Sequence, residues 1–241
     1  MKEIRYFYVP EAEIRTELPD EEAKHATRVL RLDMGDEMFL VDGKGTLCKA
    51  EVTAISNKHC LYRIVEATKK ESTWHGKVNL AIAPTKMMDR IEWMAEKATE
   101  IGIDEISFID CKFSERKSIR TDRVERIVVS AMKQSHKTWK PVVNEMSSFK
   151  AFVDAPRKGN KYIAHCYNEV ERKDLLQELQ TADINAETTI LVGPEGDFSI
   201  DEVRYALSKG FTSVSLGQSR LRTETAGLFA VMTANTCKRK L

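Results

Sequence analysis

Two short loops in the last quarter of this 241-residue chain combine glycines with charged side chains, the residue types from which ligand sites are often built. The first loop, GPEGDF, spans residues 193–198, and the second, LGQSRLRTETA, spans residues 216–226. Glycine turns that follow strands and open onto helix N-termini are where α/β proteins bind ligands with exposed polar groups. Each loop could also be a simple tight turn, so the prediction of a ligand site rests on the two loops together.

Each loop is expected between the end of a strand and the start of a helix. Ser199 and Glu202 have the spacing of a capping box, which predicts that a helix begins directly after the first loop. Thr223 or Thr225 is expected to cap the helix that follows the second loop. The elements around the loops therefore decide whether they can form one site.

Strands and helices alternate from residue 77 onward. The expected strands are 78–83, 105–110, 162–166, 189–192 and 213–216. The expected helices are 87–101, 122–135, 173–180, 200–209 and 224–238. Strict alternation predicts a parallel sheet covered by helices on both faces.

The first 70 residues have a different pattern. Four short strands are expected, at 5–9, 37–41, 48–52 and 61–65. The sequence DGKG at 42–45 signals a hairpin between two of them, and Asp20 is a plausible cap for one intervening helix. Strands this short and frequent predict a small barrel. A polar stretch at 68–73 suggests a linker, so we expect domains at 1–70 and 74–241.

Composition and charge narrow the class of protein. Hydrophobic residues make up 42% of the chain and charged residues 31%, as in ordinary globular proteins. No apolar run approaches the roughly 20 residues that span a bilayer, and the five cysteines lack C-x-x-C spacing, so we expect a cytoplasmic protein without membrane contact or metal.

The net charge is +1, but residues 112–140 hold nine Lys or Arg against three Asp or Glu. This segment is either a footprint for a phosphate backbone or a solvated helix face.

The motifs of several other chemistries are absent. The chain has no G-x-G-x-x-G after its first α/β strand and no G-x-x-x-x-G-K-[ST], which removes the usual support for dinucleotide oxidoreduction and P-loop phosphoryl transfer. It also has no H-E-x-x-H, no clustered Cys/His set and no G-x-S-x-G, so the sequence does not indicate a metalloprotease or a serine hydrolase.

The two loops resemble the cofactor site of the SPOUT methyltransferases. More narrowly, the chain is similar to the ribosomal small-subunit RNA methyltransferase E family, which methylates N3 of a uridine. The segment HATRVLR at 25–31 looks like that family's H-x-x-x-V-L-R segment, and EKATEIG at 96–102 resembles part of its first long helix. SERKS at 114–118 and AMKQS at 131–135 match further parts of the pattern. Asp197 departs from it, because the family usually has a second glycine there.

The resemblance implies a fold and an activity. The fold is α/β, with a small N-terminal PUA-like β-barrel followed by a SPOUT-type domain whose parallel sheet carries a trefoil knot. The implied cofactor is S-adenosyl-L-methionine, and the implied partner is 16S ribosomal RNA or the small ribosomal subunit. The implied activity is methylation of N3 of a specific uridine in that RNA, by a homodimer formed partly through the final helix.

The resemblance and the local chemistry together suggest site residues. The expected cofactor-binding residues are Val192, Gly193, Pro194, Glu195, Gly196, Leu216, Gly217, Leu221, Arg222, Thr223 and Ala226. The expected RNA-binding residues are Arg5, Arg28, Arg31, Arg116, Lys117 and Arg120. Arg222 is the candidate for stabilising negative charge on the uracil, because a guanidinium is always charged and rich in donors. Glu224 is a candidate base, although a carboxylate in the first turn of a helix is also ordinary capping.

Two other functions stay open. One is a SPOUT enzyme that methylates another RNA base or a ribose 2′-hydroxyl. The other is a non-catalytic RNA-binding assembly factor that kept the fold. Gly193, Gly196, Gly217 and Arg222 argue against the assembly factor, since a protein freed from cofactor binding has less reason to hold this combination.

Overall fold

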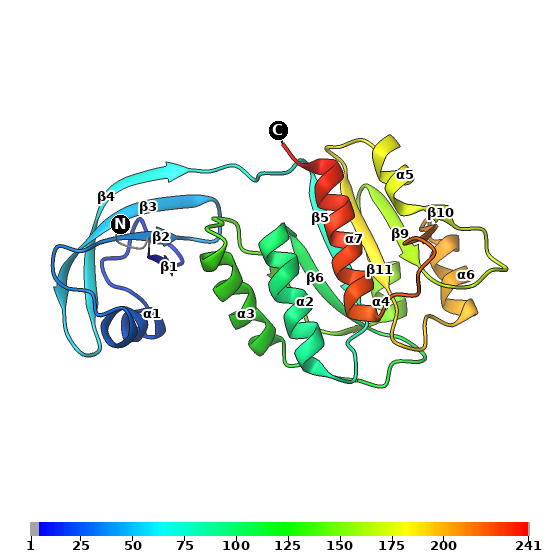
Figure 1. Ribbon diagram of the computed structural model, residues 1–241, viewed down its shortest axis with the longest axis horizontal. Coiled ribbons are helices and arrows are strands. Elements are labelled where there is room, and N and C mark those ends of the chain that lie inside the picture. The colour runs from blue at the N-terminus through cyan, green and yellow to red at the C-terminus, as the bar shows by residue number, and fades with distance from the viewer. Residues whose placement is uncertain (1–4, 241) are drawn as a thin grey trace. The chain divides into compact units, whose positions relative to one another are not determined.

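The computed structural model describes residues 5–240 and divides the chain into two compact units (Figure 1). The first unit is Met1–Ser72 with Val129–Lys140, and the second is Thr73–Val128 with Pro141–Leu241. Each unit has a hydrophobic core of its own.

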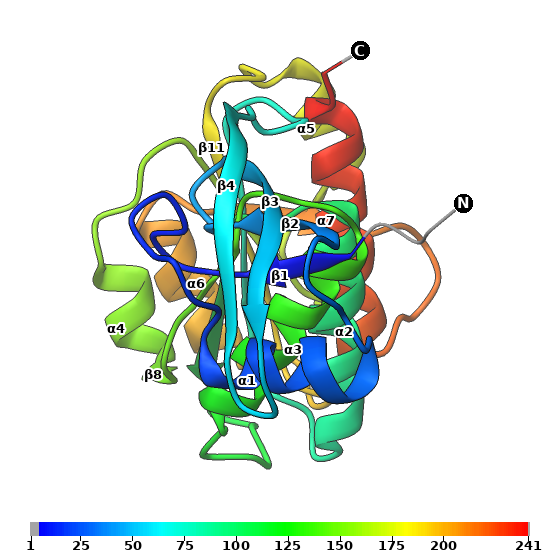
Figure 2. The same cartoon turned by 90° about the vertical axis from the view of Figure 1, so that its left-hand side faces the viewer.

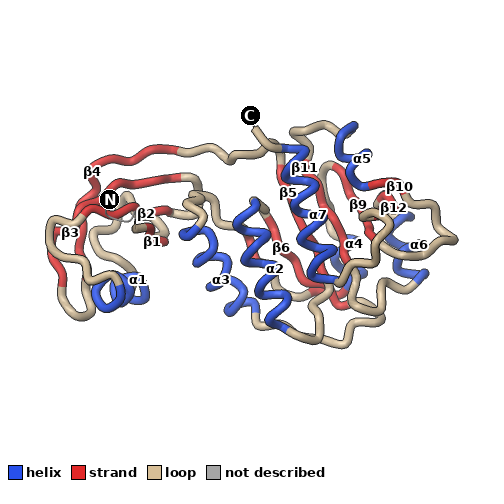
Figure 3. The backbone as a smooth tube through the Cα atoms, in the orientation of Figure 1, coloured by secondary structure: helices blue, strands red, loops and turns tan. Residues whose placement is uncertain are grey.

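The second unit is built on a parallel sheet (Figure 3). Its strands are β5 (Lys77–Ile82), β6 (Glu105–Asp110), β7 (Val142–Val143), β8 (Ser147–Ser148), β9 (Asn160–Ala164), β10 (Lys173–Asp174), β11 (Glu187–Val192) and β12 (Thr212–Ser215). They lie in the order β10-β12-β9-β11-β5-β6-β7, with β8 paired to β6. Every pairing is parallel, which confirms the prediction from the alternating pattern.

Helices cover both faces of this sheet. They are α2 (Met88–Ile101), α4 (Phe149–Asp154), α5 (Leu175–Thr181), α6 (Ile200–Ser208), α7 (Thr223–Lys238) and the first part of α3 (Thr121–Gln134), whose residues from 129 onward belong to the first unit. Figure 2 shows α4 and α6 on one side of the sheet and α2 and α7 on the other. Successive side chains of a strand point to opposite faces. Accordingly, Ile190 and Val192 of β11 join the core beneath α2 and α7, whereas Leu191 joins the core beneath α4 and α6.

Three neighbouring strands, β12, β9 and β11, end at the same edge of the sheet. Ala164 of β9 is in register with both Val192 of β11 and Val214 of β12, so the loops after these strands leave from adjacent positions. Helix α7 follows the second loop and lies close against the sheet. An added Cβ at Gly227 would come within 2.8 Å of Ile82 Cδ1, so a larger residue there would force the Ile82 side chain to shift.

The helices next to the two loops begin differently. The capping box of Ser199 and Glu202 at the start of α6 is confirmed. The prediction that Thr223 or Thr225 caps the final helix is wrong, because α7 begins at Thr223 with Arg222 as its N-cap and no side-chain cap. A threonine inside the first turn lies too late in the helix to cap it. The first N–H groups of α7 therefore remain available to a ligand.

The first unit contains a four-stranded sheet. Its strands lie in the order β1 (Tyr6–Tyr8), β2 (Glu37–Val41), β3 (Thr46–Ile55) and β4 (Cys60–Lys69). Strand β1 is parallel to β2, and the other pairs are antiparallel. The Asp42 carboxylate accepts hydrogen bonds from the amides of Lys44 (2.7 Å) and Thr46 (2.8 Å), which closes the predicted hairpin. Strands β3 and β4 are longer than predicted, chiefly at residues 53–55 and 66–69, where most positions are exposed and show no apolar alternation.

Helix α1 (Asp20–Lys24) continues into a π-helical turn, η1 (His25–Val29). The prediction that Asp20 caps this helix is wrong, because Asp20 is the first helical residue and Pro19 precedes it as the N-cap.

The sequence did not predict α4, β7, β8 or β10, because elements of two to six residues are too short to show a period. Among residues 5–240, no helix combines the length and apolar character needed to cross a bilayer.

Candidate functional site

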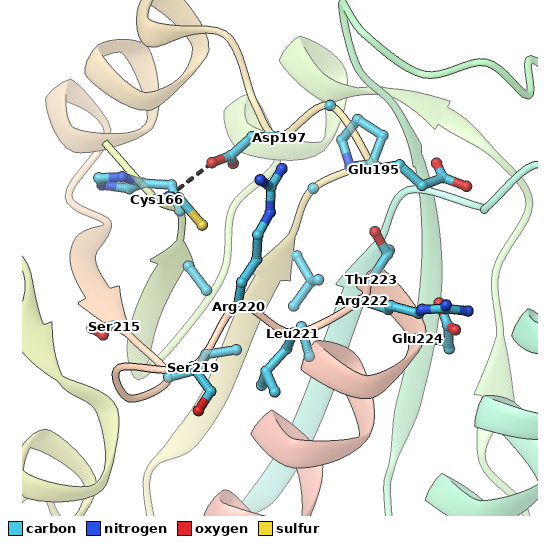
Figure 4. A pocket seen from close by; sticks show the side chains of 18 of the residues that line it. Cys166, Glu195, Asp197, Ser215, Ser219, Arg220, Leu221, Arg222, Thr223 and Glu224 are labelled. Carbon is cyan, nitrogen blue, oxygen red and sulfur yellow. Dashed lines mark hydrogen bonds between the residues drawn. The ribbon is translucent and has the colours of Figure 1, made fainter. Parts of the chain in front are cut away.

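A cavity of about 470 Å³ lies at the sheet edge where β9, β11 and β12 end (Figure 4). Its lining includes all the residues predicted to bind the cofactor, together with Glu224. It also includes residues that were not predicted from the sequence, namely Ala164, His165, Cys166, Arg172, Ser215, Ser219, Arg220 and Arg90. The only sequence signal for the first three is their position at the end of the expected strand 162–166. The structure thus brings the two loops, the end of β9 and the start of α7 around one space.

Asp197 joins the first loop to the end of β9. Its amide donates to the carbonyl of Pro194 at 2.9 Å, and its φ of 67° lies in the left-handed region. One carboxylate oxygen accepts from the amide of Phe198 at 2.7 Å. The other accepts from the amide of Cys166 at 2.8 Å, the bond dashed in Figure 4. The carboxylate at this position therefore ties together two segments that line the cavity.

The two loops need glycine for different reasons. At Gly193 an added Cβ would lie 3.0 Å from the amide nitrogen of Phe198, so crowding within the loop disfavours a side chain. At Gly217 an added Cβ would meet no protein atom within 4 Å, but φ is 104°. The backbone conformation, rather than crowding, requires glycine at residue 217.

Glu224 is a buried carboxylate in the first turn of α7. Its Oε1 lies 3.6 Å from Nη1 of Arg90, and its side chain is 9% exposed. Its Oε2 has no hydrogen-bond partner among residues 5–240. Arg222, two residues earlier, is exposed, and its carbonyl accepts from the amide of Ala226 at 2.7 Å. The start of α7 therefore presents a guanidinium and a carboxylate with one unused oxygen (Figure 4).

His165 is a buried imidazole in the lining of the cavity. Its Nδ1 accepts from the amide of Tyr167 at 3.2 Å, so its proton lies on Nε2, which donates to Ser213 Oγ at 2.6 Å. Burial lowers the pKa of His165; the Asp197 carboxylate acts against this shift, and Arg172 adds to it. The environment therefore favours the neutral ring.

The predicted RNA-binding residues of the basic segment already have partners within the second unit. These are the Thr85 and Lys86 carbonyls for Arg116 (3.1 and 2.6 Å), Asp110 for Lys117 (2.6 Å) and Asp122 for Arg120 (3.2 Å). Lys117 and Arg120 are nevertheless exposed, and exposed ion pairs are weak enough to exchange for a phosphate.

The other predicted RNA-binding residues lie in the first unit. Arg5 and Arg28 line one groove of that unit, whereas Arg31 does not. Arg31 follows η1 with a left-handed φ of 49° and an exposed side chain. Within the part of the chain that the structure describes, no three His, Cys, Asp or Glu side chains are placed to hold a metal ion.

Comparison with known proteins shows the family. The sequence pattern of the RNA methyltransferase domain matches residues 72–235, and that of the RNA methyltransferase PUA domain matches residues 18–65. The chain belongs to this RNA methyltransferase family. The match to the RNA methyltransferase domain includes every residue that lines the cavity.

Relatives agree in sequence and in fold. The crystal structure of a probable rRNA-methyltransferase from Porphyromonas gingivalis is 41% identical and has a TM-score of 0.90 over 98% of each chain. A ribosomal RNA small subunit methyltransferase E from Neisseria gonorrhoeae, solved bound to S-adenosyl methionine, is 25% identical, with a TM-score of 0.85 over 97% of this chain and 98% of that one. The ribosomal RNA small subunit methyltransferase E of Aquifex aeolicus is 31% identical over 87% of this chain and 89% of its own length. These likenesses confirm the mixed α/β fold of the RNA methyltransferase family, with a PUA domain at its N-terminus.

Proposed function

We propose that this protein transfers the methyl group of S-adenosyl-L-methionine to N3 of a specific uridine in the 16S RNA of the small ribosomal subunit. The observation that carries the proposal is the cavity, which gathers both predicted loops in a chain of the RNA methyltransferase family. Relatives named for small-subunit RNA methylation, one of them solved with the cofactor, support the choice of substrate and cofactor.

The residues around the cavity fit this cofactor. Ligand pockets enclose about 300–1,000 Å³ and combine apolar walls with a few polar groups, and this cavity measures about 470 Å³. Leu216 and Leu221 provide apolar walls suited to an adenine ring. Gly193 and Gly217 line the cavity without a side chain, so a ligand can come close to their backbone. Charged side chains of both signs also line the cavity and match the carboxylate and ammonium of the amino-acid end.

The cofactor site is assigned to the residues expected from the sequence. They are Val192, Gly193, Pro194, Glu195, Gly196, Leu216, Gly217, Leu221, Arg222, Thr223 and Ala226. When bound, S-adenosyl-L-methionine would supply an activated methyl group, because its positively charged sulfur is a good leaving group. The Glu195 carboxylate accepts from the amide of Lys86 at 3.0 Å, which steadies the first loop around the site.

Glu224 and Arg222 are assigned to the chemistry of the uracil. N3–H is a poor nucleophile until its proton is removed, and Glu224 Oε2 has no partner and can accept that proton. Arg90 keeps the other carboxylate oxygen engaged, which orients the group. Loss of the proton spreads negative charge over O2 and O4 of the uracil. The Arg222 guanidinium and the uncapped N–H groups of α7 stabilise this charge.

The division of labour along the chain is part of the proposal. Residues 1–70 form a PUA-like RNA-binding domain, and residues 74–241 form the methyltransferase domain. Residues 129–140 are compact with the first unit and add to its surface. RNA contacts are assigned to Arg5, Arg28, Arg31, Arg116, Lys117 and Arg120. The trefoil knot and the cytoplasmic location stay predictions.

A homodimer through α7 completes the proposal. Phe229 and Met232 of α7 are 37% and 48% exposed, and Trp93 of the adjoining helix α2 is 46% exposed. Large apolar side chains gathered on two helices in contact favour burial against a second copy of the chain.

The test is methyl transfer to small ribosomal subunits that lack uridine N3 methylation, with the methyl group of the cofactor radiolabelled. We expect label in 3-methyluridine at one position, which also stops primer extension because the methyl group blocks Watson–Crick pairing. Label in a 2′-O-methyl ribose or in another base would contradict the N3 assignment. Absence of label with a protein that binds the cofactor and the subunit would support a non-catalytic role instead.

A further inference from the structure

A groove of about 1000 Å³ in the first unit takes no part in the chemistry proposed above. Its lining belongs entirely to that unit, since it comes from residues 5–30 and 130–136. The groove combines stacked rings, cations and one buried carboxylate. The side chains that matter here are Arg5, Tyr6, Glu22, Arg28, Lys133 and His136.

Stacked rings form one part of the groove. The Tyr6 ring lies parallel to the His136 ring, with centroids 4.3 Å apart and an angle of 11° between the planes. Tyr6 also stacks on Phe39, with centroids 5.5 Å apart. His136 is exposed and ends this series. An exposed ring that is already held by stacking is a platform for one more flat ring, and proteins bind unpaired bases on such platforms.

The backbone at His136 is unusual for a histidine. His136 follows the end of α3 and has a φ of 55°. Its amide donates to the carbonyl of Lys133 at 3.1 Å, and the amide of Lys137 donates to the carbonyl of Met132 at 2.9 Å. This is the position at which helices usually place glycine. The backbone conformation alone would therefore favour glycine over histidine at residue 136.

Cations form the second part of the groove. Lys133 lies 2.6 Å from Glu22, and Arg5 lies 3.4 Å from Asp36, so both have a partner. Arg28 is exposed, and its guanidinium makes no hydrogen bond or ion pair within residues 5–240. A guanidinium without a partner beside a stacking platform suits the phosphate of a nucleotide.

The buried carboxylate gives the groove its selectivity. Glu22 is 8% exposed, one of its oxygens is bound by Lys133, and Oε2 has no hydrogen-bond partner among the described residues. A buried acceptor without a donor is unfavourable until a ligand supplies one. Adenine, cytosine and guanine carry an exocyclic amino group that can donate, whereas uracil has no amino group and presents two carbonyl oxygens on either side of its single N3–H.

We propose that this groove binds an unpaired nucleotide of the RNA substrate whose base carries an exocyclic amino group. The base stacks on His136, its amino group donates to Glu22, and its phosphate lies on Arg28. The proposal rests on the proposed function only for the identity of the RNA. It assigns a nucleotide different from the target uridine, which has no amino group to offer.

The test compares two pyrimidine probes that differ at position 4 of the base. Fluorescein-labelled hexacytidylate and hexauridylate are titrated with the full chain, and binding is followed by anisotropy. We expect the wild-type chain to bind hexacytidylate about fivefold or more tightly than hexauridylate. His136→Gly should weaken hexacytidylate binding about tenfold, because base stacking on an aromatic ring is lost. The same variant should unfold at an equal or higher temperature, because glycine adopts this φ without strain.

Two further variants complete the test. Glu22→Gln keeps the shape of the side chain but adds a donor, so the ratio of the two affinities should fall toward one. His59→Ala removes an exposed histidine outside the groove of the same unit and should leave both affinities unchanged. Equal binding of the two probes by the wild-type chain, or unchanged binding by His136→Gly, would overturn the proposal.

Calorimetric titration with S-adenosyl-L-methionine separates this proposal from the proposed function. A chain that binds the cofactor but neither probe contradicts the groove alone. A chain that prefers hexacytidylate but binds no cofactor supports the groove and contradicts the proposed methyl transfer.

Discussion

The cavity of the second unit and the groove of the first unit are both lined by polar groups, but they are built differently. The cavity is formed by two loops and a strand end, which all lie at the ends of adjacent parallel strands. The groove is formed by side chains from residues 5–30 and 130–136, which share no strand edge. One site is therefore shaped by local conformation, and the other depends on tertiary packing.

The difference between the cavity and the groove is clearest at two residues whose backbone is left-handed. Gly217 lines the cavity with φ of 104°, and His136 lines the groove with φ of 55°. At Gly217 the backbone excludes a side chain, whereas at His136 a side chain is kept against the preference of the backbone. We expect the cavity to be sensitive to added side chains and the groove to be sensitive to removed ones.

The largest effect is expected from Glu224→Gln, which removes the proposed proton acceptor from the cavity. The rate of methyl transfer to small subunits should fall about 10²–10⁴-fold, the usual contribution of a general base. The affinities for S-adenosyl-L-methionine and hexacytidylate should stay within about twofold of wild type, since Gln has the same shape and the groove is in the other unit. Glu171→Gln is the control and should leave the rate unchanged, because Glu171 is an exposed carboxylate of the same unit that does not line the cavity. An unchanged rate in Glu224→Gln would show that Glu224 is not the proton acceptor.

A smaller effect is expected from two substitutions of Asp197. Asp197→Ala loses the hydrogen bond to Cys166 and keeps a strained φ, so its free energy of unfolding should fall by about 2–4 kcal/mol. Asp197→Gly loses the same bond but relieves the strain, so it should be more stable than the alanine variant by about 1 kcal/mol. Urea unfolding measures both. Equal stability of the two variants would show that left-handed strain has no part in shaping the cavity.

The smallest effect is expected from the pH dependence of stability at His165. Because burial lowers the pKa of His165, its neutral form stabilises the fold above the unfolded pKa, and this contribution is lost as pH falls toward the folded pKa. The free energy of unfolding should therefore decrease below about pH 6.5, by at most about 1.4 kcal/mol per pH unit. His165→Gln should flatten this slope. A slope identical in the wild-type chain and this variant would assign the pH dependence to other groups.

Much of the second unit could be predicted because its signals are local. Alternating strands and helices indicated the parallel sheet, and Ser199 with Glu202 marked the start of α6. The glycines of the two loops that line the cavity indicated a ligand site there. The bond from Asp197 to Cys166 and the pairing of Glu224 with Arg90 could not be predicted, because they join segments distant in sequence.

The groove of the first unit left almost no signal in the sequence. Tyr6, Glu22 and His136 are ordinary residue types without characteristic spacing, and only the packed fold places them together. Arg5 and Arg28 were expected to contact RNA as charges alone, without the ring or the carboxylate beside them. The cap of α7 was predicted wrongly because the sequence does not fix the exact residue at which the helix begins. A threonine can cap a helix only from the position before the first turn, and that position is Arg222.

The most direct test of the central claim is calorimetric titration of S-adenosyl-L-methionine into the wild-type chain, Gly217→Val and Gly35→Val. Gly35 is the matched control, because its φ is 88° and an added Cβ would also meet no atom within 4 Å, but it does not line the cavity. Both valine variants should lose about 1–3 kcal/mol of unfolding free energy through backbone strain. We predict saturable binding by the wild-type chain and by Gly35→Val, and none by Gly217→Val. Equal affinity in all three proteins would contradict a cofactor site at the ends of β9, β11 and β12.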